Sequence, residues 1–157
     1  MKTLIYAFGN PGRQDDALGN ELVDAIQLWI EHNDIKEVDC DSNYQLNIED
    51  AEQISHYDKV IFVDASMAAI EDVSFEKVEP SDAKVEFSMH AVSPAYVVDL
   101  CMKMYDNCPE SYLLQIKGYQ WDFLEPMTEA AHKNLKKAIS LIKYKTLMDQ
   151  KEAIVIT

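Results

Sequence analysis

The chain has 157 residues, of which 48% are hydrophobic and 27% are charged. These values are typical of a single globular domain with a substantial core, and they exclude an intrinsically disordered chain. The formal net charge of −14 disfavours nucleic acids and anionic membrane surfaces as partners, because their phosphate groups would be repelled.

The cysteines and the N-terminal segment indicate where such a protein resides. Cys40, Cys101 and Cys108 are an odd number and form no Cys-x-x-Cys pair, which disfavours a disulfide framework and a cysteine zinc site. The first ten residues do not fit a signal peptide, and no apolar segment approaches the ~18–20 residues that span a bilayer. We therefore expect a cytoplasmic protein that does not bind membranes.

The sequence opens with a predicted strand, a loop and a helix. Residues 3–8 form a short apolar run that stops at Gly9, which is typical of a buried strand. From residue 16 to residue 32 the apolar side chains recur every three or four positions, which predicts an amphipathic helix. Asp15 and Asp16 are both candidates for its N-cap, because acidic side chains stabilise the first turn of a helix.

The middle of the chain continues this alternation. A weak strand is predicted over residues 35–40 and a short helix over residues 47–54. The nearly continuous apolar run of residues 59–63 is typical of a central strand in a parallel sheet. Two further strand-like stretches follow, at residues 73–80 and 84–90.

A helix, a strand and a long helix complete the predicted order. Ser93 is expected to cap a helix that begins at Pro94, since serine is a good N-cap and proline is favoured at the first helical position. Residues 111–116 indicate another buried strand, and residues 128–148 indicate a long amphipathic helix. Residues 151–157 are expected to form a C-terminal tail or a short extra strand.

Alternating strands and helices predict the α/β class. We expect one domain over residues 1–150, built as a three-layer αβα sandwich around a mainly parallel, twisted sheet. In open sheets of this kind, ligands bind beyond the carboxyl ends of the strands. The functional site should therefore lie where four segments meet: residues 9–16, 64–67, 88–94 and 117–121.

Residues 9–16, the first of these segments, do not have the pattern of a phosphate-binding loop. Gly9 and Gly12 match neither the dinucleotide-binding nor the P-loop glycine pattern, and the two acids that follow would repel a phosphate from the helix start. The glycines are expected to serve a tight turn and a close ligand approach to the backbone. Arg13, the sole arginine of the chain, is a candidate for a residue that clamps a carboxylate or braces an acidic site at a pocket mouth.

Three side chains with metal-binding chemistry follow predicted parallel strands. Asp64 ends an apolar strand, where an unpaired carboxylate is costly to bury, so it is either a loop hydrogen-bond acceptor or a functional group. With Asp16 and His90 it would offer two oxygen ligands and one nitrogen ligand to a divalent first-row metal ion. The sequence has no Gly-x-Ser-x-Gly elbow, and no cysteine is predicted at a strand end, so a serine or cysteine nucleophile is unsupported.

Residues 9–19, GNPGRQDDALG, resemble the N-terminal signature of the nickel–iron hydrogenase maturation endopeptidases. Residues 60–66, VIFVDAS, are similar to the central-strand motif of that family, and His90 stands in a Ser-x-His context where its members carry a histidine. The order and spacing of these motifs extend the resemblance from residue 1 to about residue 145. One departure is Asp16, where many members have glutamate.

The resemblance implies an endopeptidase that removes a C-terminal extension from a hydrogenase large-subunit precursor after nickel insertion. It implies that the nickel carried by this substrate is contacted by Asp16, Asp64 and His90. We also expect Gly9, Asn10 and Arg13 to contact the substrate. Either the nickel polarises the scissile carbonyl, or it only marks the substrate and Asp16 or Asp64 is the general base. We expect a monomer that binds nickel weakly on its own.

Two other functional classes remain open. A receiver-like phospho-acceptor domain would use an acid pair, a strand-end aspartate, a hydroxyl and a lysine. The residues available for these roles are, in that order, Asp15 with Asp16, Asp64, Ser88 and Lys117. Against it, no helix is evident between the strand-like stretches that separate Asp64 from His90. A non-catalytic nickel- or partner-binding module would share the three ligands but leave its partner uncut.

Overall fold

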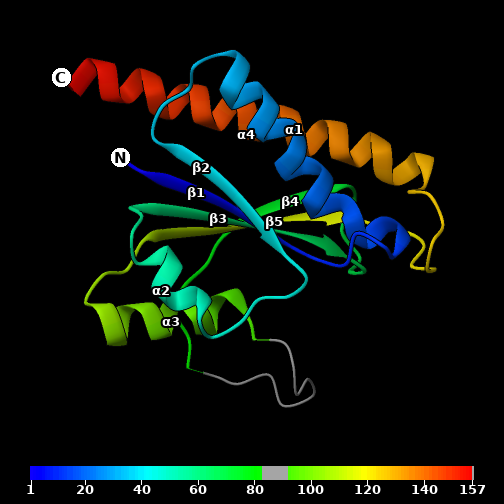
Figure 1. The fold of residues 1–157 in the computed structure, drawn as a ribbon, viewed down its shortest axis with the longest axis horizontal. Helices are drawn as coiled ribbons and strands as arrows, with labels where there is room; N and C mark the ends of the chain where they lie inside the picture. The colour runs from blue at the N-terminus through cyan, green and yellow to red at the C-terminus, as the bar shows by residue number, and fades with distance from the viewer. Residues whose placement is uncertain (83–91, 157) are drawn as a thin grey trace.

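The computed structural model of the protein describes residues 1–82 and 92–156. Within these ranges five strands form one sheet, and helices cover both of its faces (Figure 1). The elements are β1 (Thr3–Phe8), a 3-10 turn η1 (Gln14–Ala17), α1 (Leu18–His32), β2 (Val38–Asn43), α2 (Asp50–Ile54), β3 (Lys59–Ser66), β4 (Val73–Lys77), α3 (Pro94–Tyr105), β5 (Glu110–Lys117) and α4 (Glu129–Ile156).

The sheet has the order β2-β1-β3-β5-β4. Strands β2, β1, β3 and β5 are parallel, and the edge strand β4 pairs antiparallel with β5. The predicted α/β class with a mainly parallel sheet is therefore confirmed. Because the parallel strands run in one direction, the loops that follow them meet along one edge of the sheet.

Each face of the sheet is buried by a pair of helices, α1 with α4 on one face and α2 with α3 on the other (Figure 1). In β1, Ile5 and Ala7 belong to the core under α1 and α4, whereas Leu4 and Tyr6 belong to the core above α2 and α3. Successive strand residues point to opposite faces, so a strand covered on both sides is apolar at every position. This explains the unbroken apolar runs in β1 and β3.

Several predicted boundaries differ from the structure. The Ser93 cap is confirmed, since its hydroxyl accepts a hydrogen bond from the Tyr96 N–H at 3.1 Å and Pro94 begins α3. The predicted N-cap of α1 is wrong: Asp15 and Asp16 lie within η1, and Ala17 precedes α1 without a side-chain cap.

The edge strand β2 and the end of the chain also differ from the prediction. Strand β2 begins at Val38 and runs to Asn43, three residues later than predicted, because its exposed edge carries few apolar side chains. Helix α4 continues to Ile156, so the terminal strand alternative is wrong and no separate tail begins at residue 151. The predicted strand at residues 84–90 lies outside the described residues.

A close contact between α1 and the sheet fixes the start of the helix. A Cβ atom at Gly19 would lie 3.0 Å from the Ala7 Cβ and 3.2 Å from the Val63 carbonyl oxygen. Glycine therefore lets the first turn of α1 approach the ends of β1 and β3 more closely than any other residue would allow. Asp16 stands one helical turn before Gly19, and Asp64 directly follows Val63, so this contact brings their two segments together.

Candidate active site

The chain leaves the ends of β1, β3 and β5 on the right of Figure 1, and hydrogen bonds join neighbouring strand ends there. The Gly9 N–H donates to the Asn43 carbonyl at 3.0 Å, which joins the ends of β1 and β2. The Gly118 N–H donates to the Ser66 carbonyl at 3.0 Å, which joins the ends of β5 and β3. Three of the four predicted segments, residues 9–16, 64–67 and 117–121, therefore lie at the carboxyl edge of the sheet and include Asp16 and Asp64, whereas residues 88–91 of the fourth lie outside the described residues.

Asp16 is held by the turn that precedes it. Its Oδ2 accepts a hydrogen bond from the Asn10 N–H at 2.7 Å, and the Asn10 side-chain oxygen accepts one from the Gly12 N–H at 2.9 Å. Gly9 has a φ of 156°, and a Cβ there would lie 2.4 Å from the Asp16 carbonyl oxygen. Gly9 is therefore required by the tight turn, and the Asn10 backbone orients the Asp16 carboxylate.

Asp64 lies near the end of β3 and is partly buried. Burial and, to a smaller extent, the negative charge of Asp16 raise its pKa from an ordinary value of 3.8 to about 7, and the hydrogen bond from the Ala65 N–H opposes the shift. Asp16 and Asp64 are therefore close enough to repel one another in a partly desolvated setting. Such a pair favours a proton or a cation between its members.

Asn20 is a further member of this site that the sequence analysis did not identify. Its side-chain oxygen is buried, and among the described residues it is the one buried side-chain nitrogen or oxygen without a hydrogen-bond partner. It lies 3.6 Å from the position that a Gly9 Cβ would occupy, and Asp16 Oδ1 lies 3.4 Å from the same position. Asparagine at position 20, one helical turn after Asp16, was the only sequence signal for it.

These oxygen atoms suit a cation but do not complete a metal site on their own. Two carboxylates and a neutral amide oxygen are hard ligands for a divalent ion. Within residues 1–82 and 92–156, no three histidine, cysteine, aspartate or glutamate side chains are grouped as a metal site would need. His90, the third predicted ligand, and Ser88 lie outside the described residues. The described site therefore leaves room for ligands from elsewhere.

Asp15 has a different function from its neighbour Asp16. It is fully buried, and its carboxylate accepts hydrogen bonds from the N–H groups of Tyr119, Gln120 and Thr128 and from the Thr128 hydroxyl, at 2.7–3.1 Å. The carboxylate thus anchors the loop between β5 and α4. Because both carboxylate oxygens of Asp15 accept these bonds in a buried position, Asp15 is unavailable for the acidic pocket of a receiver-like domain.

Arg13 contacts the loop that follows β5, and a role in clamping a carboxylate of a bound partner stays a prediction. Its side chain is exposed, its Nε donates to the Trp121 carbonyl at 2.9 Å, and its guanidinium lies 5.5 Å from the centre of the Phe123 ring. No ion pair of Arg13 occurs among the described residues. Through these contacts Arg13 braces the loop that follows β5.

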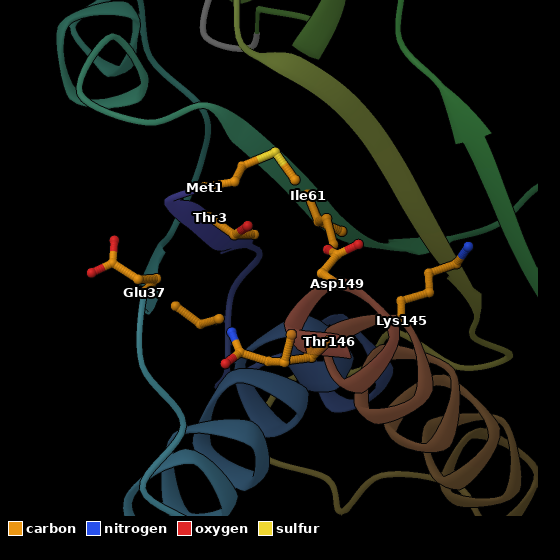
Figure 2. A pocket seen from close by; sticks show the side chains of 9 residues that line it. Met1, Thr3, Glu37, Ile61, Lys145, Thr146 and Asp149 are labelled. Carbon is orange, nitrogen blue, oxygen red and sulfur yellow. The ribbon is translucent and has the colours of Figure 1, made fainter. Parts of the chain in front are cut away.

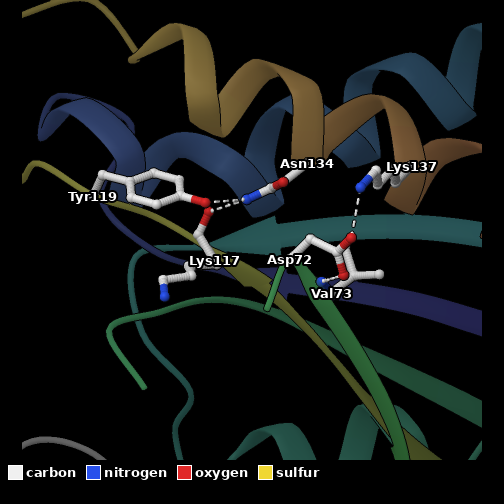
Figure 3. A network of polar contacts seen from close by, with 6 residues as sticks. All are labelled: Asp72, Val73, Lys117, Tyr119, Asn134 and Lys137. Carbon is white, nitrogen blue, oxygen red and sulfur yellow. Dashed lines mark hydrogen bonds and ion pairs between the residues drawn. The ribbon is translucent and has the colours of Figure 1, made fainter. Parts of the chain in front are cut away.

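A polar network holds the end of β5 against α4 (Figure 3). The buried Asn134 side chain donates to the Lys117 carbonyl and to the Tyr119 hydroxyl, both at 3.0 Å. On the next turn of α4, Lys137 forms a 2.6 Å ion pair with Asp72, which precedes β4. The loop that begins at Gly118 is therefore fixed at its start by Asn134 and along its length by Asp15.

The cavity drawn in Figure 2 is not part of this site. It has a volume of about 100 Å³ and lies between α4 and the beginnings of β1 and β2, where Thr3, Val38 and Thr146 line it. That is the edge of the sheet opposite to the carboxylates. The polar groups of the cavity include Asp149, which is already paired with Lys59 at 2.9 Å.

Comparison with known proteins identifies the fold. The structure is similar to the crystal structure of a NiFe hydrogenase maturation protease, HycI, from Thermococcus kodakarensis KOD1, with a TM-score of 0.70, 19% identity and coverage of 90% of this chain and 89% of that one. It is similar to the hydrogenase maturating endopeptidase HybD from Escherichia coli, with a TM-score of 0.67, 15% identity and 90% coverage of both chains. An Escherichia coli endopeptidase in solution gives a TM-score of 0.70, 16% identity and coverage of 96% and 94%.

These similarities show that the chain has the fold of the hydrogenase maturation proteases. No protein-family model matches the sequence, and no curated protein matches it. None of the described helices combines the length and apolar character needed to cross a bilayer.

Asp64 makes the stability of the protein depend on pH in a defined direction. Its pKa is about 7 in the folded state and lower in the unfolded chain, so the folded state binds more protons between about pH 4 and about pH 7. The free energy of unfolding should fall as the pH rises through this window. Asp64→Asn should remove that decline and be more stable at about pH 8 by about 2–4 kcal/mol. Urea unfolding across this pH range tests it, and equal pH dependence in both proteins would contradict it.

The adjacent acids Asp15 and Asp16 should respond very differently to the same substitution. Asp15→Asn places an amide group among four hydrogen-bond donors in a buried site, which should lower the free energy of unfolding by about 2–4 kcal/mol. Asp16→Asn loses one charged hydrogen bond but relieves repulsion with Asp64, so its cost should stay below about 1 kcal/mol. Chemical unfolding of both variants measures the difference; similar losses would show that Asp15 is not the anchor.

Proposed function

We propose that this chain belongs to the hydrogenase maturation proteases and acts in the cytoplasm as an endopeptidase. Its substrate is the nickel-loaded precursor of a hydrogenase large subunit, from which it removes a C-terminal extension. The observation that carries the proposal is the Asp16–Asp64 pair. Two mutually repelling carboxylates stand at the carboxyl edge of a fold shared with proteins of that activity.

The pair supports recognition of a cation that the substrate supplies. Their repulsion, without a cationic side chain paired to either among the described residues, is relieved when a positive ion arrives. The buried acceptor of Asn20 adds a further oxygen beside Asp16. We assign His90 as the nitrogen contact to the same nickel, on the basis of the sequence motif. Specificity for loaded precursor then arises as a difference between two affinities.

Hydrolysis of the extension needs a group that takes a proton from water. The water oxygen bonds to the scissile carbonyl carbon, the carbon–nitrogen bond breaks, and the leaving amine gains a proton. A general base works best when its pKa is near the operating pH. In the free protein the pKa of Asp64 is about 7, and burial, the larger of its two causes, still acts when a cation neutralises Asp16. We therefore assign proton transfer to Asp64 and contact with the substrate's nickel to Asp16.

The other functional classes have less support. A receiver-like domain would need Asp15 in its acidic pocket, but that carboxylate is buried and anchors a loop. A non-catalytic nickel-binding module shares the same ligands and differs only in whether the bound precursor is cut. Incubation with nickel-loaded precursor therefore separates the two.

Removal of either charge in the pair should stop processing without unfolding the protein. Asp16→Asn and Asp64→Asn should each slow cleavage of a nickel-loaded large-subunit precursor by at least about 100-fold, because a general base or its partner is lost. Mass spectrometry of the released extension gives the rate. Asp24→Asn, an exposed acid on α1, is the matched control and should cleave normally. Normal cleavage by either site variant would refute the assignment.

The nickel carried by the precursor should increase the affinity of the protein for that precursor. We expect calorimetry to show at least about tenfold tighter binding of the nickel-loaded precursor than of the empty precursor. Nickel alone should bind weakly, because Asp16, Asp64 and His90 would offer only three ligands, two of them hard carboxylates. Asp16→Asn should abolish the difference between the two precursors. Equal affinity of the wild-type protein for the loaded and the empty precursor would show that Asp16 and Asp64 do not recognise the nickel.

A further inference from the structure

Large apolar side chains are exposed on the loop between β5 and α4, at the same edge of the sheet as the two carboxylates. Leu124 is 92% exposed, Phe123 is 68% exposed and Tyr119 is 42% exposed. We call these three residues the apolar platform. Single exposed apolar residues are common on protein surfaces, but neighbouring ones beside a candidate site indicate an interaction surface.

The platform is held rigidly by the loop that carries Asp16. The Leu124 N–H donates to the Gly12 carbonyl at 3.0 Å, and Arg13 donates to the Trp121 carbonyl at 2.9 Å. The Asp122 N–H donates to the Gln14 side chain at 3.0 Å. Because the loop is already ordered, a ligand that binds here does not bear the entropic cost of ordering it.

The backbone of Leu124 makes this exposure unusual. Its φ of 61° lies in the left-handed region, which glycine and asparagine adopt more readily than leucine does. The chain therefore places a leucine in an unfavourable conformation that directs it into solvent. Burial of that side chain by a bound partner would recover a hydrophobic contribution that the free protein lacks.

The surroundings of the platform define the chemistry of its partner. Exposed Asp122 and Glu125 flank Phe123 and Leu124, whereas Arg13 and Lys117 lie over the rings of Phe123 and Tyr119. The chain as a whole carries a net charge of −14. The charges beside the platform are thus mixed, but the acidic chain as a whole attracts a polypeptide segment that carries basic side chains, and the exposed apolar side chains favour an apolar residue within it. Gly12 and Arg13 connect this surface directly to the turn that holds Asp16.

We propose that the apolar platform binds an apolar side chain in a basic segment of the substrate polypeptide, close to the bond that is cut. The proposal rests on the proposed function and adds a second recognition element to it, independent of the metal. The platform residues do not touch the reacting atoms. They act on substrate affinity, so their loss raises KM and leaves kcat nearly unchanged.

The test compares Phe123→Ser/Leu124→Asn with the wild-type protein, using nickel-loaded large-subunit precursor. Asparagine tolerates the backbone of position 124, so the variant removes apolar surface and keeps the loop conformation. We expect KM to rise at least tenfold and kcat to change less than twofold. Leu147→Gln, which changes a leucine on α4 that is 51% exposed, is the matched control and should leave both constants unchanged.

A second arm uses precursors in which single apolar residues near the cleaved bond are replaced by serine. One such replacement should raise KM for the wild-type protein but not for the platform variant, as expected for two groups in contact. An unchanged KM in the platform variant, or an equal rise in Leu147→Gln, would overturn the proposal. So would sedimentation showing that the platform variant converts a wild-type dimer into a monomer, since the platform would then bind a second copy of this chain.

Binding measurements keep this inference separate from the proposed function. If the wild-type protein binds the precursor but does not cut it, the endopeptidase function fails. The platform proposal still stands in that case if Phe123→Ser/Leu124→Asn weakens binding at least tenfold by calorimetry. If the wild-type protein cuts the precursor and the variant binds it with unchanged affinity, the platform proposal fails alone.

Discussion

The structure depends on holding two carboxylates close together at a partly desolvated edge of the sheet. Asp16 and Asp64 repel one another, and the environment of Asp64 raises its pKa to about 7. Such an arrangement persists only where surrounding contacts over-determine it. Here those contacts are the turn at Gly9, the close approach of Gly19 to β1 and β3, and the Asn10 N–H that fixes Asp16. A cation bound at the pair would relieve this repulsion, and the relief would add to the affinity for the cation.

Much of the fold was predictable because its physical causes are local or periodic. The apolar runs of β1 and β3 result from burial on both faces, and the Ser93-Pro94 cap of α3 acts within one turn. The carboxyl-edge rule also predicted that Asp16 and Asp64 would meet. The start of β2 was misplaced because an exposed edge strand has no apolar pattern, and the terminal strand was predicted because valine and isoleucine there suit a strand as well as a helix.

The functions of Asp15 and Arg13 could not be predicted because their partners are more than a hundred residues away in sequence. Asp15 binds donors from residues 119–128, and Arg13 contacts Trp121 and Phe123. No local pattern distinguishes the buried anchor Asp15 from the site residue Asp16 beside it. The same long-range contacts connect the turn that holds Asp16 to the apolar platform. Recognition of the cation and of the polypeptide that carries it would thus depend on one rigid unit, in which displacement of the loop disturbs both.

The most direct test of this view is the position of nickel in a complex of the protein with its nickel-loaded precursor. Anomalous diffraction at the nickel absorption edge locates the ion without reference to the surrounding density. We predict a nickel peak between the carboxylates of Asp16 and Asp64, within coordination distance of Asp16, with the Asn20 side-chain oxygen facing the same space. A nickel peak remote from both carboxylates would contradict the central claim that Asp16 and Asp64 recognise the nickel of the substrate.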